Sequence, residues 1–143
     1  MQANQVAGGF YLVFDQGEEV VSLLTRFCEE QEVHWATFQA IGAVEDVEIG
    51  YYDLEAREYY FREEEGPFEV ANMTGNVAEI NQGPTVHAHA VLSRCDESLE
   101  CLGGHLKSAR VAVTLELSLW RVSMPLLRRY DEDTGLNLIN LTL

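Results

Sequence analysis

The apolar positions near the N-terminus predict a short strand followed by one helix. Phe10 to Phe14 is a run of aromatic and aliphatic residues that ends at the polar stretch Asp15 to Gly17, a pattern typical of a strand and its turn. Apolar residues then recur at helical spacing from Val20 to Cys28, behind two glutamates that favour a first helical turn. We therefore expect a helix from residue 18 to about residue 31, with Cys28 on its buried face.

From Trp35 onward the apolar period changes to two, which predicts a sheet. The strands expected from this period and from the intervening turns cover residues 35–44, 47–53, 58–61, 68–77, 85–93 and 110–122. Asn81 to Pro84 is expected to form the turn before the fifth of them. The chain thus reads as a β-rich protein with a single helix near its front.

The last expected strand alternates strictly between two kinds of residue. Val111, Val113, Leu115, Leu117 and Leu119 are expected to face the core. The opposite face carries Glu116 and Trp120, so it is either exposed to solvent or covered by another surface, for which a neighbouring subunit is one candidate.

Composition places the chain among globular proteins. Its 143 residues, of which 47% are hydrophobic, suffice for one continuous core, so we expect one domain over residues 1–143. The expected class is α/β in the broad sense (α+β), with a mixed or antiparallel sheet and one main helix. The densest charged stretch, residues 55–69, is interpreted as a solvated hairpin face rather than an acidic binding surface.

Charge and cysteine content narrow the function. The 24 acidic residues against 9 Lys and Arg give a net charge of -15, which opposes direct contact with nucleic-acid phosphates. Three cysteines without CxxC spacing do not indicate a disulfide framework; Cys95 and Cys101 flank a polar turn, where a reactive or metal-binding thiol is the less favoured interpretation. No signal peptide or membrane-spanning stretch is recognised, so a soluble, cytoplasmic protein is expected.

Three of the four histidines lie within 19 residues of one another and form the strongest candidate site. His87 and His89 are two residues apart on an expected strand, so both imidazoles project from the same face. His105 follows Gly103-Gly104, where the absence of side chains permits unusual backbone angles and a close approach to the preceding strand. Neutral imidazole nitrogens are zinc ligands, and the three histidines therefore predict a site for a divalent metal ion, with zinc favoured.

Other interpretations of these histidines, and other candidate ligands, were compared with the three-histidine metal site. Two strand histidines on their own most often simply face water. Three protein ligands leave a position open, and Cys101, Asp96 and Glu116 are weak candidates for a fourth ligand, whereas His34 has no same-face partner and is interpreted as structural. A cupin also pairs HxH with a later histidine, but Ser93 and Arg94 stand where its glutamate ligand is expected. No nucleophile elbow, P-loop or GxGxxG motif is present.

Several segments together resemble the plants and prokaryotes conserved (PPC) domain, in its stand-alone prokaryotic form; the same module is attached to AT-hooks in plants. The segments that carry the resemblance are Gly42-Ala43-Val44, Gly50-Tyr51-Tyr52-Asp53, Gly66-Pro67-Phe68-Glu69-Val70, Thr74-Gly75-Asn76, Gly83-Pro84-Thr85-Val86-His87-Ala88-His89-Ala90-Val91-Leu92, Gly103-Gly104-His105-Leu106, and the tail from Arg128-Arg129-Tyr130-Asp131 to Thr134-Gly135-Leu136. The resemblance implies an α/β fold, a homotrimer, and a metal held through His87, His89 and His105. It also brings a DNA-binding label, although no Arg-Gly-Arg-Pro-like hook occurs in this sequence.

The leading functional hypothesis is a metal-binding, trimeric interaction or regulatory module that associates with DNA only through a protein partner. The first alternative is a metal-dependent enzyme for a small molecule, in which the metal activates a water and a carboxylate such as Glu116 moves the proton. The second alternative is a protein that binds DNA directly.

Overall fold

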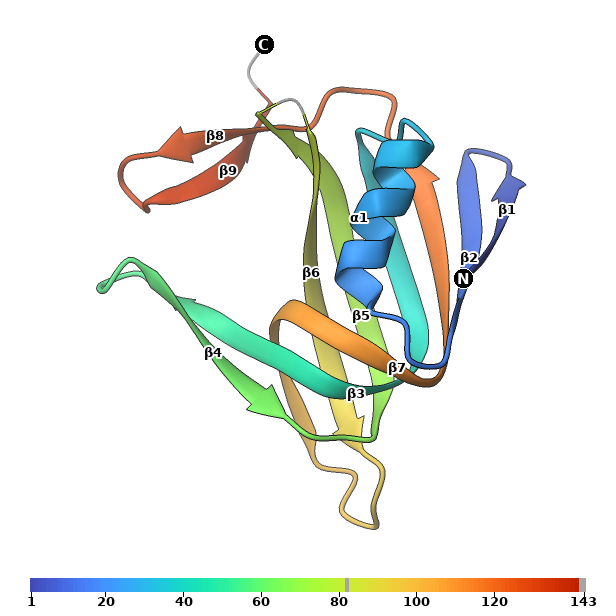
Figure 1. The fold of residues 1–143 in the computed structure, drawn as a ribbon. Coiled ribbons are helices and arrows are strands. Elements are labelled where there is room, and N and C mark those ends of the chain that lie inside the picture. Colours follow the sequence, from blue (N-terminus) through green and yellow to red (C-terminus); the bar gives the residue numbers. More distant parts are fainter. Residues whose placement is uncertain (82, 142–143) are drawn as a thin grey trace.

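A computed structural model describes residues 1–81 and 83–141. It shows a β-rich fold in which the described residues form one helix, α1 (Val20–Glu30), and nine strands (Figure 1). The strands are β1 (Gln2–Val6), β2 (Gly9–Asp15), β3 (Ala36–Asp53), β4 (Glu58–Glu64), β5 (Phe68–Ile80), β6 (Gly83–Arg94), β7 (Cys101–Arg121), β8 (Leu127–Asp131) and β9 (Leu136–Asn140). The expected class, a β-rich fold with one helix near the N-terminus, is confirmed.

The sheet is mixed but almost wholly antiparallel. Its main path runs β1-β2-β7-β3-β5-β8-β9; β4 pairs with β3, and β6 pairs with both β5 and β7. Only the β5–β8 contact, through Glu79 and Leu127, is parallel among the described pairings. Because β7 pairs with β3 and also with β6, the strands β3, β5, β6 and β7 form a closed ring of hydrogen-bonded neighbours.

The helix covers the core side of this sheet. Glu19 precedes α1 and its carboxylate accepts hydrogen bonds from the backbone N–H groups of Val21 and Ser22, which satisfies two donors that a helix start leaves unpaired. Its buried residues, Val20, Leu24, Phe27 and Cys28, join the core, as the helical period predicts. The helix packs on β6 and β7. It is not long and apolar enough to cross a membrane, and no other helix is found among the described residues.

The last long strand departs from its expected alternation at one point. Leu115, Leu117 and Leu119 are fully buried, but Val113 is 69% exposed rather than in the core. Between Gly42 and Val44 the pairing of β3 with β7 skips from Leu115 to Val111, so β7 carries extra residues there. Such a bulge changes which way the side chains point, and it explains why a strict period of two fails at Val113.

Other boundaries also differ from expectation. β7 begins at Cys101 rather than at residue 110, so its glycine pair lies inside a strand. β6 begins at Gly83, which shortens the expected turn at 81–84; Gln82 of that turn lies outside the described residues. The polar strand β1 and the tail hairpin of β8 and β9 were not expected, because neither carries a clear apolar period.

Candidate metal centre

The three histidines lie on two neighbouring strands. His89 of β6 and His105 of β7 are directly opposite each other in the antiparallel register. His87 precedes His89 by two residues and projects from the same face, while Ala88 and Ala90 between and after them are buried, each 3% exposed. The predicted sidedness of β6 is therefore confirmed, and sheet pairing explains how a residue 16 positions further along the chain joins the first two.

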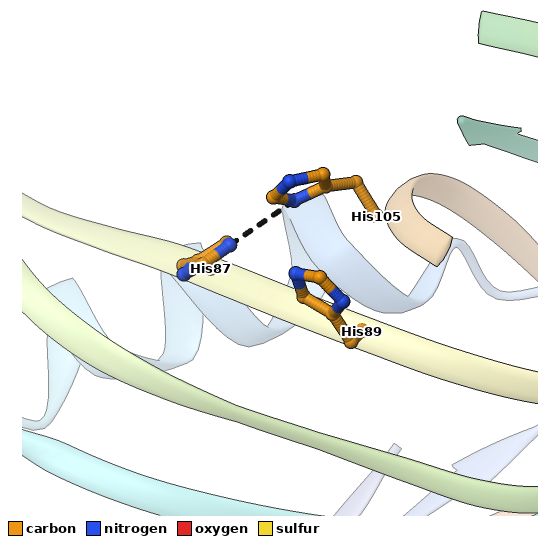
Figure 2. A group of neighbouring side chains, drawn as sticks. All are labelled: His87, His89 and His105. Atoms are coloured by element: carbon orange, nitrogen blue, oxygen red, sulfur yellow. Dashed lines mark hydrogen bonds between the residues drawn. The ribbon is translucent and has the colours of Figure 1, made fainter. Parts of the chain in front are cut away.

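Their side chains converge (Figure 2). One ligand atom from each histidine lies within 4.8 Å of the others, and no other His, Cys, Asp or Glu among the described residues completes this group. The His87 Nε2 and His105 Nδ1 atoms are 3.1 Å apart, and the rings of His89 and His105 have centroids 4.1 Å apart. Three nitrogens at these separations require only small rotations to face a single ion.

The glycine pair has ordinary extended backbone rather than the unusual angles expected, and its closest approach is to β3 rather than to the preceding strand. Gly103 and Gly104 pair with Val91 and Ala90 of β6, and neither has a positive φ. A Cβ atom on Gly104 would lie 2.3 Å from the carbonyl oxygen of Gly50 on β3. The missing side chain therefore allows β7 to pass close to β3 just before His105.

Burial favours the neutral form of two of the histidines, His87 and His105. The pKa of His87 is lowered to about 4, first by burial and then by the positive charge of Arg128 and the two neighbouring histidines. The pKa of His105 is also lowered, by burial and by His89. Both rings are therefore neutral near pH 7, which is the form that binds metal.

The tail hairpin adds a fourth residue to the cluster. Arg128 of β8 places its Nη2 atom 3.2 Å from His87 Nδ1, and the same atom donates a hydrogen bond to Asn76 Oδ1 at 2.8 Å. Its Nη1 atom donates to the carbonyl oxygen of Asn137 at 3.0 Å. Sequence reasoning gave Arg128 no role, because the two residues are 41 positions apart and no spacing rule joins them.

A cleft opens beside His87 and His105. It has a volume of about 440 Å³ and lies between the tail hairpin and the end of the β3–β4 hairpin, which extend to the same side of the molecule (Figure 1). Two hydrogen bonds join these hairpins, from the Tyr52 hydroxyl to the carbonyl oxygen of Thr134 at 2.7 Å and from Arg57 to that of Asp133 at 3.1 Å. His87 and His105 thus line the wall of this cleft.

A comparison with known protein families identifies the family of this chain. The family described as the Plants and Prokaryotes Conserved (PCC) domain matches residues 1–123. The chain belongs to this family. The matched segment holds all three histidines of the site and ends before β8, so Arg128 lies beyond it.

Several solved structures superpose on nearly the whole chain. A metal-containing protein from Archaeoglobus fulgidus is 38% identical, with a TM-score of 0.83 and coverage of 92% of this chain and 91% of that one. A PPC protein from Pyrococcus horikoshii is 27% identical, with a TM-score of 0.81 and coverage of 93% and 92%. A Ralstonia eutropha protein, for which DNA binding has been suggested, is 25% identical, with a TM-score of 0.89 and coverage of 98% and 96%. No protein of curated function matches.

None of the three proposed fourth ligands of this PPC domain joins the histidines. Glu116 lies towards the other end of β7, where it pairs with Ile41 and its carboxylate accepts a hydrogen bond from the Tyr11 hydroxyl at 3.0 Å. Asp96 is engaged with Ser98 in the β6–β7 turn, and Cys101 is an exposed free thiol at the start of β7. Because Glu116 is remote from the histidines, it is also unsuited to the proton transfer proposed for it.

The fourth histidine has a partner that its sequence position did not indicate. His34 Nδ1 lies 3.2 Å from Glu79 Oε1, and the other oxygen of the same carboxylate accepts a hydrogen bond from Trp35 Nε1 at 2.9 Å. His34 is thus tied to β5 and lies outside the histidine cluster, in keeping with a structural role.

Proposed function

We propose that this PPC-domain protein binds one divalent cation per chain, zinc being favoured, through His87, His89 and His105. The observation that carries the proposal is the convergence of three imidazole nitrogens within 4.8 Å. At least two of the rings have a lowered pKa, so they offer lone pairs near neutral pH without first losing a proton.

The donor set fits zinc better than the hard cations. Magnesium and calcium prefer oxygen ligands, whereas the described cluster offers only imidazole nitrogens. Imidazole suits zinc, copper, nickel and iron, so availability in the cell also bears on which is bound. The metal-containing relative from Archaeoglobus fulgidus, with 38% identity over most of both chains, supports a metal in this fold.

Single substitutions test the site. His87→Ala, His89→Ala and His105→Ala are each expected to weaken zinc binding by about 100-fold or more, because each removes one of three protein ligands. The affinity is measured by competition with a chromophoric chelator, and circular dichroism verifies the fold. His34→Ala is the matched control, because it removes a histidine outside the cluster. Equal zinc affinity in wild type and all three site variants would refute the assignment.

We also propose that the protein is a homotrimer in solution. Tyr11, Ile41 and Trp120 lie on the neighbouring strands β2, β3 and β7 and point away from the core; we call them the outer apolar patch. They are 41%, 55% and 45% exposed, and such a patch is a common feature of subunit interfaces. Light scattering at micromolar concentration should give the mass of a trimer, and Ile41→Asp should lower it, whereas Leu54→Asp in an exposed turn should not. A monomeric mass for the wild type would refute the trimer.

As a biological role we propose an interaction or regulatory module that reaches DNA only through a partner. Beyond the net charge of -15, five of the nine basic residues are already paired with carboxylates. Few cations are therefore free to replace counterions on a phosphate backbone.

The cleft beside the histidines favours a second candidate, a metal-dependent enzyme for a small molecule, because clefts lined by apolar and a few polar groups are typical ligand sites.

A further inference from the structure

The contact between Arg128 and His87 would have to change if His87 bound a metal. A guanidinium group only donates hydrogen bonds, so the Nδ1 atom of His87 that faces Arg128 must be an unprotonated acceptor. The proton of the neutral ring then sits on Nε2, the atom that points at His105 Nδ1. His87 could hold a metal through Nε2 only with its own proton on Nδ1, facing the guanidinium donor, and through Nδ1 only if the guanidinium moved away.

In either case the Arg128 N–H group that now contacts His87 Nδ1 would be freed beside the cleft. The residue is held elsewhere by Asn76 and by the carbonyl of Asn137, so the side chain stays anchored at the cleft wall. Its Nε atom is buried and has no hydrogen-bond partner among the described residues. An unpaired buried donor is costly, and the released guanidinium thus has two N–H directions to satisfy.

The rest of the cleft suits the body of an organic molecule. Arg57 supplies a second positive charge, and Glu58 is the only carboxylate among the described lining residues. Apolar and aromatic side chains make up much of the remaining wall, and these are Tyr52, Tyr59, Ile80, Val86, Leu136 and Leu138. In a chain of net charge -15, a hollow with two arginines and one glutamate is locally positive.

We propose that this cleft binds a small organic carboxylate, whose head group pairs with the guanidinium of Arg128 beside the histidine site. The planar fork of arginine matches a carboxylate with two parallel hydrogen bonds, and the apolar wall contacts the carbon skeleton. The inference rests on the proposed metal function, because the metal is what frees Arg128 from His87.

Benzoate is a suitable probe, with benzamide as its neutral counterpart of the same shape. Binding to zinc-loaded protein is followed by NMR chemical-shift titration. We expect benzoate to bind at least about tenfold more tightly than benzamide, since the amide cannot pair with both N–H groups of arginine. Arg128→Gln should weaken benzoate binding about tenfold or more, and Arg128→Lys should restore only part of it because lysine lacks the fork. Arg129→Gln, an exposed neighbour on the same strand, is the control.

Zinc affinity measured on the same variants separates the two proposals. Arg128→Gln should bind zinc at least as tightly as wild type, because it removes both the competing contact at His87 and a nearby positive charge. Zinc should also tighten benzoate binding, and benzoate should tighten zinc binding by the same factor. Stoichiometric zinc with equal benzoate affinity in wild type and Arg128→Gln would overturn the carboxylate site alone. Failure of the wild type to bind zinc would overturn both proposals.

Discussion

The two faces of β6 differ in what they require of their residues. On the core face Ala88, Ala90 and Leu92 are at most 3% exposed and pack under α1 and the neighbouring strands. On the outer face His87 and His89 meet His105 in a cluster that is not part of the hydrophobic core. The core face of this twelve-residue strand thus holds the fold together, and the outer face carries the candidate metal site. Substitutions should therefore separate folding from metal binding.

The largest expected effect is a difference in unfolding free energy between two substitutions on opposite faces of β6, Leu92→Ala and His89→Ala. Leu92→Ala empties a fully buried position and should lower the stability by about 2–5 kcal/mol. His89→Ala, three residues earlier on the exposed side, should change it by no more than about 0.5 kcal/mol in metal-free protein. Urea unfolding in the presence of a chelator measures both. A loss of more than about 2 kcal/mol in His89→Ala would mean that the outer face also carries the fold.

A smaller effect should appear with pH, because burial lowers the pKa of His87 on the outer face. Its pKa is about 4 when folded and about 6.5 when unfolded, so protonation favours the unfolded state. Above about pH 6.5 the ring is neutral in both states and no stability is lost. As the pH falls towards 4, the unfolded state is protonated first, and the free energy of unfolding decreases. Because the ring is only partly buried, we expect a loss of about 1–2 kcal/mol rather than the full linkage value.

This pH effect is isolated by a difference between two proteins. Metal-free wild type and His87→Gln are unfolded in urea at several pH values between 7 and 4.5, so that carboxylates common to both cancel. Wild type should lose more stability than the variant over this range. If the unfolding free energies of wild type and His87→Gln changed with pH in parallel, burial would not lower the pKa of His87.

The residues of the site differ in how far the sequence revealed them. His87 and His89 follow from local geometry, since a strand with period two places both on one face. His105 was found by its proximity in sequence and by its glycine pair, but its position inside a strand was not, because adjacent glycines usually indicate an interruption. The structural reason is Gly50, whose carbonyl oxygen leaves no room for a side chain at Gly104.

The role of Arg128 was missed, and Val113 was wrongly predicted to face the core, for a different physical reason. Both depend on pairings between distant segments: the tail hairpin must fold back before Arg128 reaches His87, and β3 must pair with β7 before the bulge at Gly42 exposes Val113. Hydrophobic periodicity reports which way a residue faces within one element. It does not report which distant element lies beside it, and the elements without a strong period, such as the tail, escape detection altogether.

The central claim, a metal held by three histidines on the outer face, is tested most directly by the metal content of protein purified without added metal. Elemental analysis of wild type and of the folded double variant His87→Ala/His89→Ala, prepared in parallel, gives the metal bound per chain. The account predicts about one equivalent of zinc or another imidazole-binding divalent metal in wild type and almost none in the variant. The same stoichiometric metal content in both proteins would contradict it.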